Sequence, residues 1–325
     1  MNGRSLFPTA FQGLLAIWCW AAPAFDAVAG EFGNRHVLLF GIDGCRSDAL
    51  KIAVEKGSAP NIAGLIHTGT VTWTAFAGGE LDQPTQQNTV SGPGWSSIFT
   101  GVWANKHGVT DNSFHGENFS RYPNLFDHLH QSHPAARFVS LVSWPPIHEN
   151  LIGPSPEDGR TAIVRHTWPH ENPVEQEKPL IAETIQTISN GDPDIVFCYQ
   201  GQVDTAGHQH GFSPDVPEYM DAIHLTDARI GEVLTAVRQR QSFASENWLL
   251  IVATDHGGSG TKHGGQSPEE RTIPLIVSGG DVAKGVVSKE IIGQTCIPAT
   301  VFHHLQVDVP ASWTWEAKAF PETAH

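Results

Sequence analysis

The residues best suited to chemistry gather in a glycine-rich stretch near the end of the chain. It begins with Asp255 and His256, and a second imidazole, His263, follows after a short loop. Carboxylates and imidazoles are typical ligands of divalent metal ions, and glycines let the backbone fold closely around an ion. The alternative is a polar turn that contains two histidines without a metal. Further ligands elsewhere in the chain would decide between these interpretations.

Further carboxylates follow two other apolar runs. Residues 37–42, 195–199 and 248–253 form continuous apolar runs of strand length, which are typical of parallel strands covered on both faces. Asp43, Asp204 and Asp255 each come just beyond one of these runs. Ligands of open parallel sheets bind at the carboxyl ends of the strands. We therefore expect the three carboxylates to meet at one edge of a sheet.

The rest of the chain repeats the order strand, polar loop, helix. Further strands are predicted at 138–142 and 274–277, and helices at 47–55, 60–66, 179–189, 219–238 and 297–305. This order predicts an α/β fold with a mainly parallel central sheet and helices on both faces. No internal repeat or low-complexity segment interrupts it, so residues 30–325 are expected to form one domain.

Six side chains then form a candidate metal constellation. They are three carboxylates and three imidazoles, Asp43, Asp204, His208, Asp255, His256 and His263. Zinc accepts such mixed ligands, and six of them would supply two ions with three each. Ser91 stands before Gly-Pro at the predicted start of a helix, where backbone amides favour an anion. It would complete one of the two sites as an alkoxide, and two-metal sites stabilise the entering and leaving oxygens of phosphoryl transfer.

The first residues are typical of an export signal. Arg4 is followed by an apolar run at 11–20, too short to span a bilayer, and by small residues at 27–29. We expect a signal peptide over residues 1–29 and a mature chain, starting near Gly30, in the periplasm or outside the cell. The alternative is an uncleaved anchor. No later run is long enough to span a membrane.

The charge of the chain excludes general binding of nucleic-acid polymers. Its 34 acidic and 19 basic residues give a formal net charge of −15, so it lacks the basic surface that phosphate backbones need. An anionic substrate would need a local positive charge, and bound metal ions are the obvious source. Three of the four cysteines, Cys45, Cys198 and Cys296, follow residue 29 and are expected to be buried free thiols.

Taken together, the motifs resemble those of the alkaline phosphatase superfamily, and within it the type I phosphodiesterase/nucleotide pyrophosphatase family. They follow the family's order and are GIDG at 41–44, SGPGWSSIFTG at 91–101, KHG at 106–108 with DN at 111–112, DTAGHQHG at 204–211, DHGG at 255–258 and HGG at 263–265. The resemblance implies two Zn²⁺ ions, or other divalent cations. One would be held by Asp43, Ser91, Asp255 and His256, and the other by Asp204, His208 and His263.

The resemblance also implies an activity. It is hydrolysis of phosphodiester or pyrophosphate bonds in a small phosphorylated substrate, such as a nucleotide, through a covalent phospho-Ser91 intermediate. The Gly92 amide would donate to a non-bridging oxygen of the phosphate. The sequence predicts neither the physiological substrate nor the oligomeric state.

One departure from the family bears on substrate class. Diesterase relatives usually carry asparagine three residues after the nucleophile, where this chain has Gly94. Asn112 is a candidate for a distant substitute. A phosphomonoesterase would need extra positive charge, for which Arg46 and Lys262 are candidates, although both fit solvated surface charges equally well. A catalytically silent relative that binds phosphorylated ligands is a further alternative.

Other residues attract attention beside these motifs. Trp95 is the aromatic residue expected to touch the substrate, and it also stands where the sulfatase signature needs arginine, which disfavours a sulfatase. Trp144 and Trp168 lie in Pro-rich segments that would either line a pocket or pack as loops. No chemical role is expected for four histidines, namely His107, His210, His303 and His304.

Overall fold

A single eight-stranded sheet runs through the centre of the molecule. The structure, a computed structural model, describes residues 30–153, 164–167 and 173–322, so the predicted signal peptide and Trp168 lie outside the described residues. The strands lie side by side in the order β4 (Val164–Thr167), β3 (Phe138–Val142), β5 (Ile195–Gln200), β1 (Arg35–Ile42), β6 (Asn247–Ala253), β7 (Thr272–Gly279), β2 (Gly69–Phe76) and β8 (Val286–Ser288).

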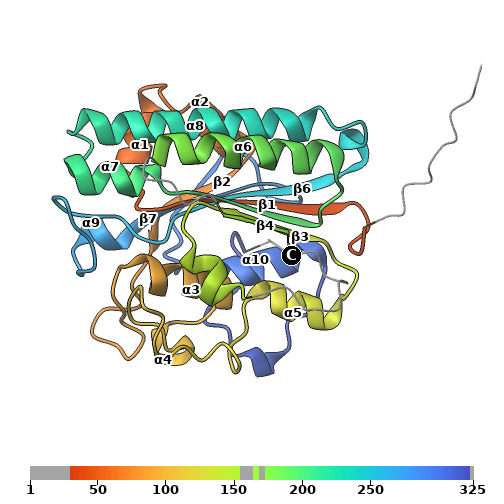
Figure 1. Cartoon of the computed structure of the whole chain (residues 1–325), viewed down its shortest axis with the longest axis horizontal. Helices are drawn as coiled ribbons and strands as arrows, with labels where there is room; N and C mark the ends of the chain where they lie inside the picture. Colours follow the sequence, from red (N-terminus) through yellow and green to blue (C-terminus); the bar gives the residue numbers. More distant parts are fainter. Residues whose placement is uncertain (1–29, 154–163, 168–172, 323–325) are drawn as a thin grey trace, which may run out of the picture.

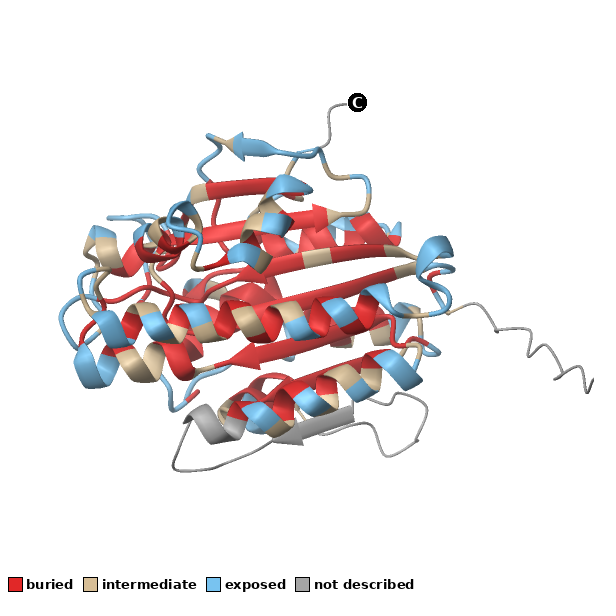
Figure 2. Ribbon diagram, turned by 90° about the horizontal axis from the view of Figure 1, so that it is seen from above, coloured by how far each residue is buried: buried red, intermediate tan, exposed pale blue. Residues whose placement is uncertain are grey.

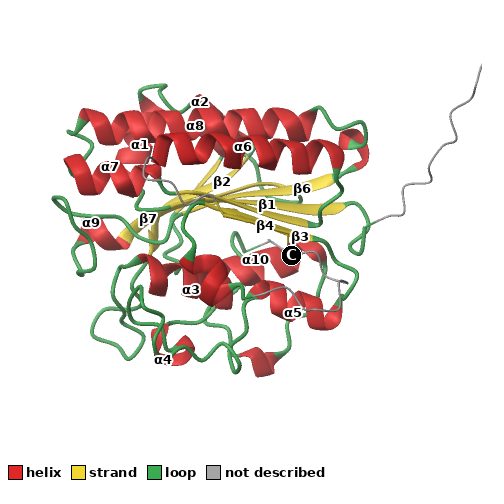
Figure 3. Cartoon of the chain, in the orientation of Figure 1, coloured by secondary structure: helices red, strands yellow, loops and turns green. Residues whose placement is uncertain are grey.

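Helices cover both faces of this sheet (Figures 1 and 3). One layer contains α1 (Ser47–Glu55), α2 (Pro60–His67), α6 (Pro173–Asn190), α7 (Gln202–His210) and α8 (Pro217–Arg238). The other contains α3 (Ser91–Thr100), α4 (Ala104–His107), α5 (Leu125–Ser132) and α10 (Cys296–Leu305), while the short α9 (Pro268–Arg271) precedes β7. Within the described residues no helix is long and apolar enough to cross a membrane.

The predicted fold class is confirmed. The pairs β4–β3, β3–β5, β5–β1 and β1–β6 are parallel, and only β7 runs antiparallel to its neighbours β6 and β2. Among the elements that were not predicted are the strand β2 and the helix α7. The strand β2 alternates threonines with apolar residues, a pattern weaker than a continuous apolar run, and α7 occupies a segment that we expected to be a loop.

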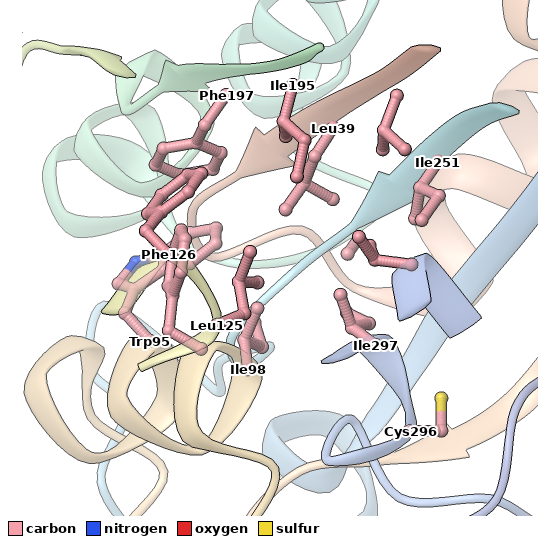
Figure 4. Close-up of a cluster of buried hydrophobic side chains, with 14 of the residues drawn as sticks. Leu39, Trp95, Ile98, Leu125, Phe126, Ile195, Phe197, Ile251, Cys296 and Ile297 are labelled. Carbon is pink, nitrogen blue, oxygen red and sulfur yellow. The ribbon is translucent and has the colours of Figure 1, made fainter. Parts of the chain in front are cut away.

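Alternate residues of each central strand pack into different layers. Leu39 and Phe197 belong to the cluster that includes Trp95 and Phe126 (Figure 4). Leu38 and Phe40 belong to the other cluster, with residues of the helices α1 and α8. Figure 2 shows the central strands buried along their length, with exposed residues on the outer sides of the helices. Burial on both faces explains the continuous apolar runs. The three cysteines Cys45, Cys198 and Cys296 are free and buried, as expected.

His107 has a structural place, as the sequence indicated. It is fully buried, its Nδ1 accepts a hydrogen bond of 3.1 Å from the Val109 N–H, and its Nε2 lies 3.0 Å from Ser97 Oγ. Burial lowers the pKa of His107 to about 3. As pH falls below about 6.5, this histidine therefore becomes protonated in the unfolded chain but stays neutral in the folded chain.

This difference predicts acid sensitivity. Stability attributable to His107 is fully present above its unfolded pKa and falls with pH by up to about 1.4 kcal/mol per pH unit. The variant His107→Asn, which keeps an acceptor for the Val109 N–H, is expected to flatten this part of the stability profile. Urea unfolding at a series of pH values measures it. The exposed His115→Asn is the matched control, and an unchanged slope in His107→Asn would contradict the argument.

Candidate metal centre

Three neighbouring parallel strands bring the predicted carboxylates to one edge of the sheet. Asp43 directly follows β1, Asp255 comes two residues after β6, and Asp204 lies in the first turn of α7, which follows β5. Since β5, β1 and β6 are adjacent in the sheet, their carboxyl ends lie side by side. The prediction that the three carboxylates meet is confirmed.

Asp43, Asp255 and His256 form a first cluster, which is buried and includes Ser91. His256 Nε2 lies 3.5 Å from Asp43 Oδ1, 3.3 Å from Asp255 Oδ2 and 3.3 Å from Ser91 Oγ. The candidate ligand atoms of Asp43, Asp255 and His256 all lie within 4.8 Å of one another. This spacing suits one small cation.

Asp204, His208 and His263 form a second cluster beside the first. The Nε2 atoms of His208 and His263 are 3.0 Å apart, and Asp204 oxygens lie 3.5 Å from His208 and 3.7 Å from His263. Helix α7 brings Asp204 and His208 together, because residues four apart share one face of a helix. The two clusters adjoin, since the rings of His256 and His263 stack with their centroids 3.9 Å apart.

All three imidazoles are held in one orientation. Each Nδ1 lies within hydrogen-bond distance of a backbone carbonyl oxygen, 3.0 Å for His208 and Thr261, 2.8 Å for His256 and Gly257, and 2.9 Å for His263 and Thr89. A carbonyl accepts only from a protonated nitrogen, so the proton stays on Nδ1 and the Nε2 lone pair points into the site. Metal-binding histidines are typically held in this way.

Each of the three carboxyl groups has one oxygen that the described residues leave without a hydrogen bond. These oxygens are Asp43 Oδ1, Asp204 Oδ1 and Asp255 Oδ2, which are buried and accept no hydrogen bond from the part of the chain that the structure describes. Burial raises the pKa of all three carboxyl groups, and the charge of Asp43 raises the pKa of Asp204 and of Asp255 further. Orphaned buried oxygens of this kind are costly unless a cation satisfies them. The donor set therefore fits metal ions.

The comparisons with known proteins agree with this chemistry. A sequence model of the family described as type I phosphodiesterase / nucleotide pyrophosphatase matches residues 37–269, which hold both clusters. The chain belongs to this family. The sequence resemblance is thereby confirmed.

Individual relatives are more distant and longer. An uncharacterised pyrophosphatase/phosphodiesterase of Schizosaccharomyces pombe is 23% identical over 75% of this chain and 50% of its own length. Ectonucleotide pyrophosphatase/phosphodiesterase family member 1 of Mus musculus is 25% identical over 70% of this chain and 24% of its own. A phosphopentomutase of a Methylobacterium species is 29% identical over 46% of this chain and 34% of its own. The chain thus spans about half or less of these relatives.

Solved structures share the fold. A 2-O GAG sulfatase superposes with a TM-score of 0.67 at 13% identity, covering 90% of this chain and 76% of its own. The phosphonate monoester hydrolase of Agrobacterium radiobacter gives a TM-score of 0.58 at 15% identity, covering 84% of this chain and 74% of its own. At these identities the likeness concerns the fold alone.

In this family member, Asn112 lies directly beside the predicted nucleophile. Ser91 is the first residue of α3, and the N–H of the next residue, Gly92, donates a 2.7 Å hydrogen bond to Asn112 Oδ1. Asn112 is exposed. The loop that follows α4 therefore supplies an amide group to the first cluster, 21 positions along the chain from Ser91.

The absence of a side chain at position 94 has a steric reason. A Cβ atom built on Gly94 would lie 2.8 Å from Asp255 Cβ and 2.9 Å from the Asp255 carbonyl oxygen. The third residue of α3 after Ser91 thus packs against the backbone that carries Asp255, and no side chain fits there. An asparagine at position 94 could not reach a substrate in this chain.

The prediction that Trp95 touches the substrate is wrong. Its side chain is 0% exposed and packs against the ring of Tyr199. It also packs against Phe197, as Figure 4 shows. The helical turn of α3 points residue 95 into the sheet, and its indole Nε1–H donates to Asp43 Oδ2 at 3.0 Å. Trp95 supports a candidate ligand.

The cation Arg46 is engaged elsewhere. Its guanidinium forms a 2.6 Å ion pair with Asp48 and donates to the carbonyl oxygen of Phe212.

Three other residues considered in the sequence are exposed or pack elsewhere. Lys262 is an exposed residue of the turn before His263. The exposed His210 is rotated by roughly 200° around α7 from His208. Trp144 is half-buried against Phe114, a packing contact.

Thr89 was missed in the sequence and links the two clusters. Its carbonyl oxygen accepts from His263 Nδ1 at 2.9 Å, and its hydroxyl donates to the Gly265 carbonyl oxygen at 2.8 Å and accepts from the Gly264 N–H at 3.1 Å. The loop that carries His263 is thereby fastened two residues before Ser91. In the sequence, the one indication of this contact is that Thr89 lies two residues before the predicted nucleophile.

Thr89→Val is expected to weaken metal binding at the second cluster about ten-fold, because the loop of His263 loses both side-chain hydrogen bonds at constant volume. Thr89→Ser keeps the hydroxyl and is expected to bind like the parent. Titration of the metal-free protein with zinc against a chromophoric chelator measures both. Equal affinities in the two variants would show that the hydroxyl plays no part.

Proposed function

We propose that this chain is a two-zinc hydrolase of phosphodiester or pyrophosphate bonds that works through phospho-Ser91. The observation that carries the proposal is the first cluster beside the Ser91 hydroxyl and the second cluster that adjoins it. Together they hold three buried carboxylate oxygens that have no hydrogen-bond partner among the described residues. Asp43, Asp255, His256 and Ser91 would hold one ion. Asp204, His208 and His263 would hold the other. Family membership supports the reaction class.

Bound zinc would supply positive charge that lowers the pKa of the serine hydroxyl and stabilises the leaving oxygen. The chain's own groups would do the rest. Ser91 Oγ attacks phosphorus, forming the Oγ–P bond as the bond from phosphorus to the leaving oxygen breaks. Water then cleaves the Oγ–P bond and restores the hydroxyl. The amide of Asn112, held next to Ser91 by the Gly92 N–H, would donate from Nδ2 to a phosphate oxygen. The Gly92 N–H, which the sequence suggested for that role, already donates to Asn112 Oδ1 and would have to release it first.

The charges around the site favour a diester. A phosphomonoester carries one more negative charge than a diester, and Arg46 is bound to Asp48 and to a backbone carbonyl. Among the described residues near the clusters, Lys262 is left as an exposed cation. The partial likeness to phosphopentomutase keeps phosphomonoester chemistry as the second candidate. A catalytically silent relative is disfavoured because the seven candidate ligands lie together.

Two chromogenic substrates test the proposal. Zinc-loaded protein is expected to hydrolyse bis-p-nitrophenyl phosphate faster than p-nitrophenyl phosphate, and a chelator is expected to stop both reactions. Faster turnover of the monoester would favour the second candidate. Failure to hydrolyse either substrate, in protein shown to contain zinc, would overturn the proposal that the chain is an enzyme of this kind.

We propose further that residues 30–325 form the catalytic domain and that residues 1–29 direct its export to the periplasm or the exterior. The amino-terminal pattern of charge, apolar run and small residues supports this. Amino-terminal sequencing of protein recovered from the periplasm or medium is expected to begin near Gly30. Recovery of uncleaved chain from the cytoplasm would contradict it.

A further inference from the structure

The two oxygens of Asp43 lie in different surroundings. Oδ2 accepts two hydrogen bonds, one of 3.0 Å from the Trp95 indole and one of 2.8 Å from the Tyr199 hydroxyl. Oδ1 is buried with no hydrogen-bond partner among the described residues and lies 3.5 Å from His256 Nε2. One oxygen is therefore held by the protein, and the other is left for the first cluster.

Both donors are fixed by packing. The Trp95 ring lies 5.5 Å from the ring of Tyr199 and 5.6 Å from that of Phe197, and all three side chains are buried. Gly41 closes the space beneath them, since a Cβ atom there would lie 2.5 Å from the Trp95 ring. Neither donor has room to turn away, because α3, β5 and β1 enclose them together.

We propose that Trp95 and Tyr199 are positioning residues that restrict Asp43 to a single-oxygen contact with the ion of the first cluster. A carboxylate can bind a cation through one oxygen or through both. Binding through both would break two hydrogen bonds in a buried site, where an unpaired donor is costly. Asp43 then takes one position at the ion and leaves room for Ser91 Oγ. This inference rests on the proposed two-metal function.

Tyr199→Phe is the sharpest test, because it removes one donor and keeps the ring. The variant is made in protein that also carries His208→Ala, which disables the second cluster and leaves one site to titrate. Zinc affinity, measured against a chromophoric chelator, is expected to fall about ten-fold. The visible absorption of bound Co²⁺ is expected to shift, because the geometry of the Asp43 contact changes.

Thr184→Val is the matched control in the same background. Thr184 is fully buried and donates a 2.8 Å hydrogen bond to the Leu180 carbonyl oxygen, and its hydroxyl lies 3.6 Å from Cys198 Sγ, next to Tyr199 in β5 but on its other face. It loses one buried hydroxyl, as Tyr199→Phe does, without touching Asp43. Its zinc affinity and Co²⁺ spectrum are expected to match those of the parent.

The inference is overturned if folded Tyr199→Phe binds zinc as tightly as the parent with the same Co²⁺ spectrum, or if Thr184→Val shows equal losses. Its failure is distinguishable from failure of the proposed function. Both measurements are of metal binding, so a protein that binds two ions but hydrolyses no phosphate ester would refute the function and leave this test intact. If the Tyr199→Phe variant binds zinc as tightly as its parent while the unmodified protein hydrolyses phosphodiesters, the positioning inference is refuted and the proposed function is not.

Discussion

Ser91→Ala is expected to abolish hydrolysis, with a loss in kcat of roughly 10³-fold or more, because the variant lacks the hydroxyl that forms the proposed covalent intermediate. The hydroxyl lies 3.3 Å from His256 Nε2, so it is already within the cluster before substrate arrives. Steady-state hydrolysis of a chromogenic diester measures the loss. Acid quenching during turnover is expected to trap a phosphoryl group on the parent and none on the variant.

The matched variant is Ser91→Thr, which keeps a hydroxyl at the same atom position and is expected to retain measurable activity. Zinc content of the alanine variant separates two causes of inactivity. Two bound ions with no turnover would assign the loss to the nucleophile. Full activity in Ser91→Ala would rule out the phospho-Ser91 pathway.

Asp204→Asn is expected to have opposite effects on the metal-free and the zinc-loaded protein. Without metal, negative charge on the neighbouring carboxyl groups of Asp43, Asp204 and Asp255 is unfavourable, since burial raises the pKa of all three and the charge of Asp43 raises that of Asp204 and Asp255 further. Removing one charge is expected to raise the melting temperature of the metal-free protein. With zinc, the variant is expected to bind about one ion fewer and to lose roughly 10²-fold or more in kcat.

Metal analysis, thermal unfolding with and without zinc, and diester hydrolysis measure these effects. Asp215→Asn is the control, since Asp215 is an exposed carboxylate in the turn after α7. A metal-free Asp204→Asn protein less stable than the metal-free parent would contradict the repulsion argument. Unchanged zinc stoichiometry would contradict the assignment of Asp204 to the second ion.

The sequence was most informative where strands are buried on both faces. The runs before Asp43, Asp204 and Asp255 are continuous and apolar, so strand, direction and sheet edge could all be predicted. Helix α7 could not, because it is short, contains Gly207, is flanked by Gly201 and Gly211, and carries several polar side chains that are also typical of a loop. Its helical form is what places Asp204 and His208 on one face.

Trp95 shows why contacts around the site were harder to predict. Its position four residues after Ser91 suggested nearness to substrate, but nearness along a helix does not fix the side that a residue faces. The turn of α3 sends it under Asp43, where Gly41 leaves space for the indole. Asn112 illustrates the converse, since a residue distant in the chain lies at the nucleophile only because the loop after α4 folds back. Long-range placement of this kind depends on packing that no local pattern encodes.

The different exposure of the two clusters has a consequence for the order in which ions enter and leave. The side chains of His256 and Asp255 are 0% exposed, whereas His208 is 45% and Asp204 19% exposed. The second cluster lies on the solvent side of the first, and His263 stacks on His256 between them. An ion bound at the second cluster would therefore block the path by which an ion bound at the first cluster reaches solvent. Loading is expected to proceed from the inner position outward, and exchange with added metal to be fast at the outer position and slow at the inner one.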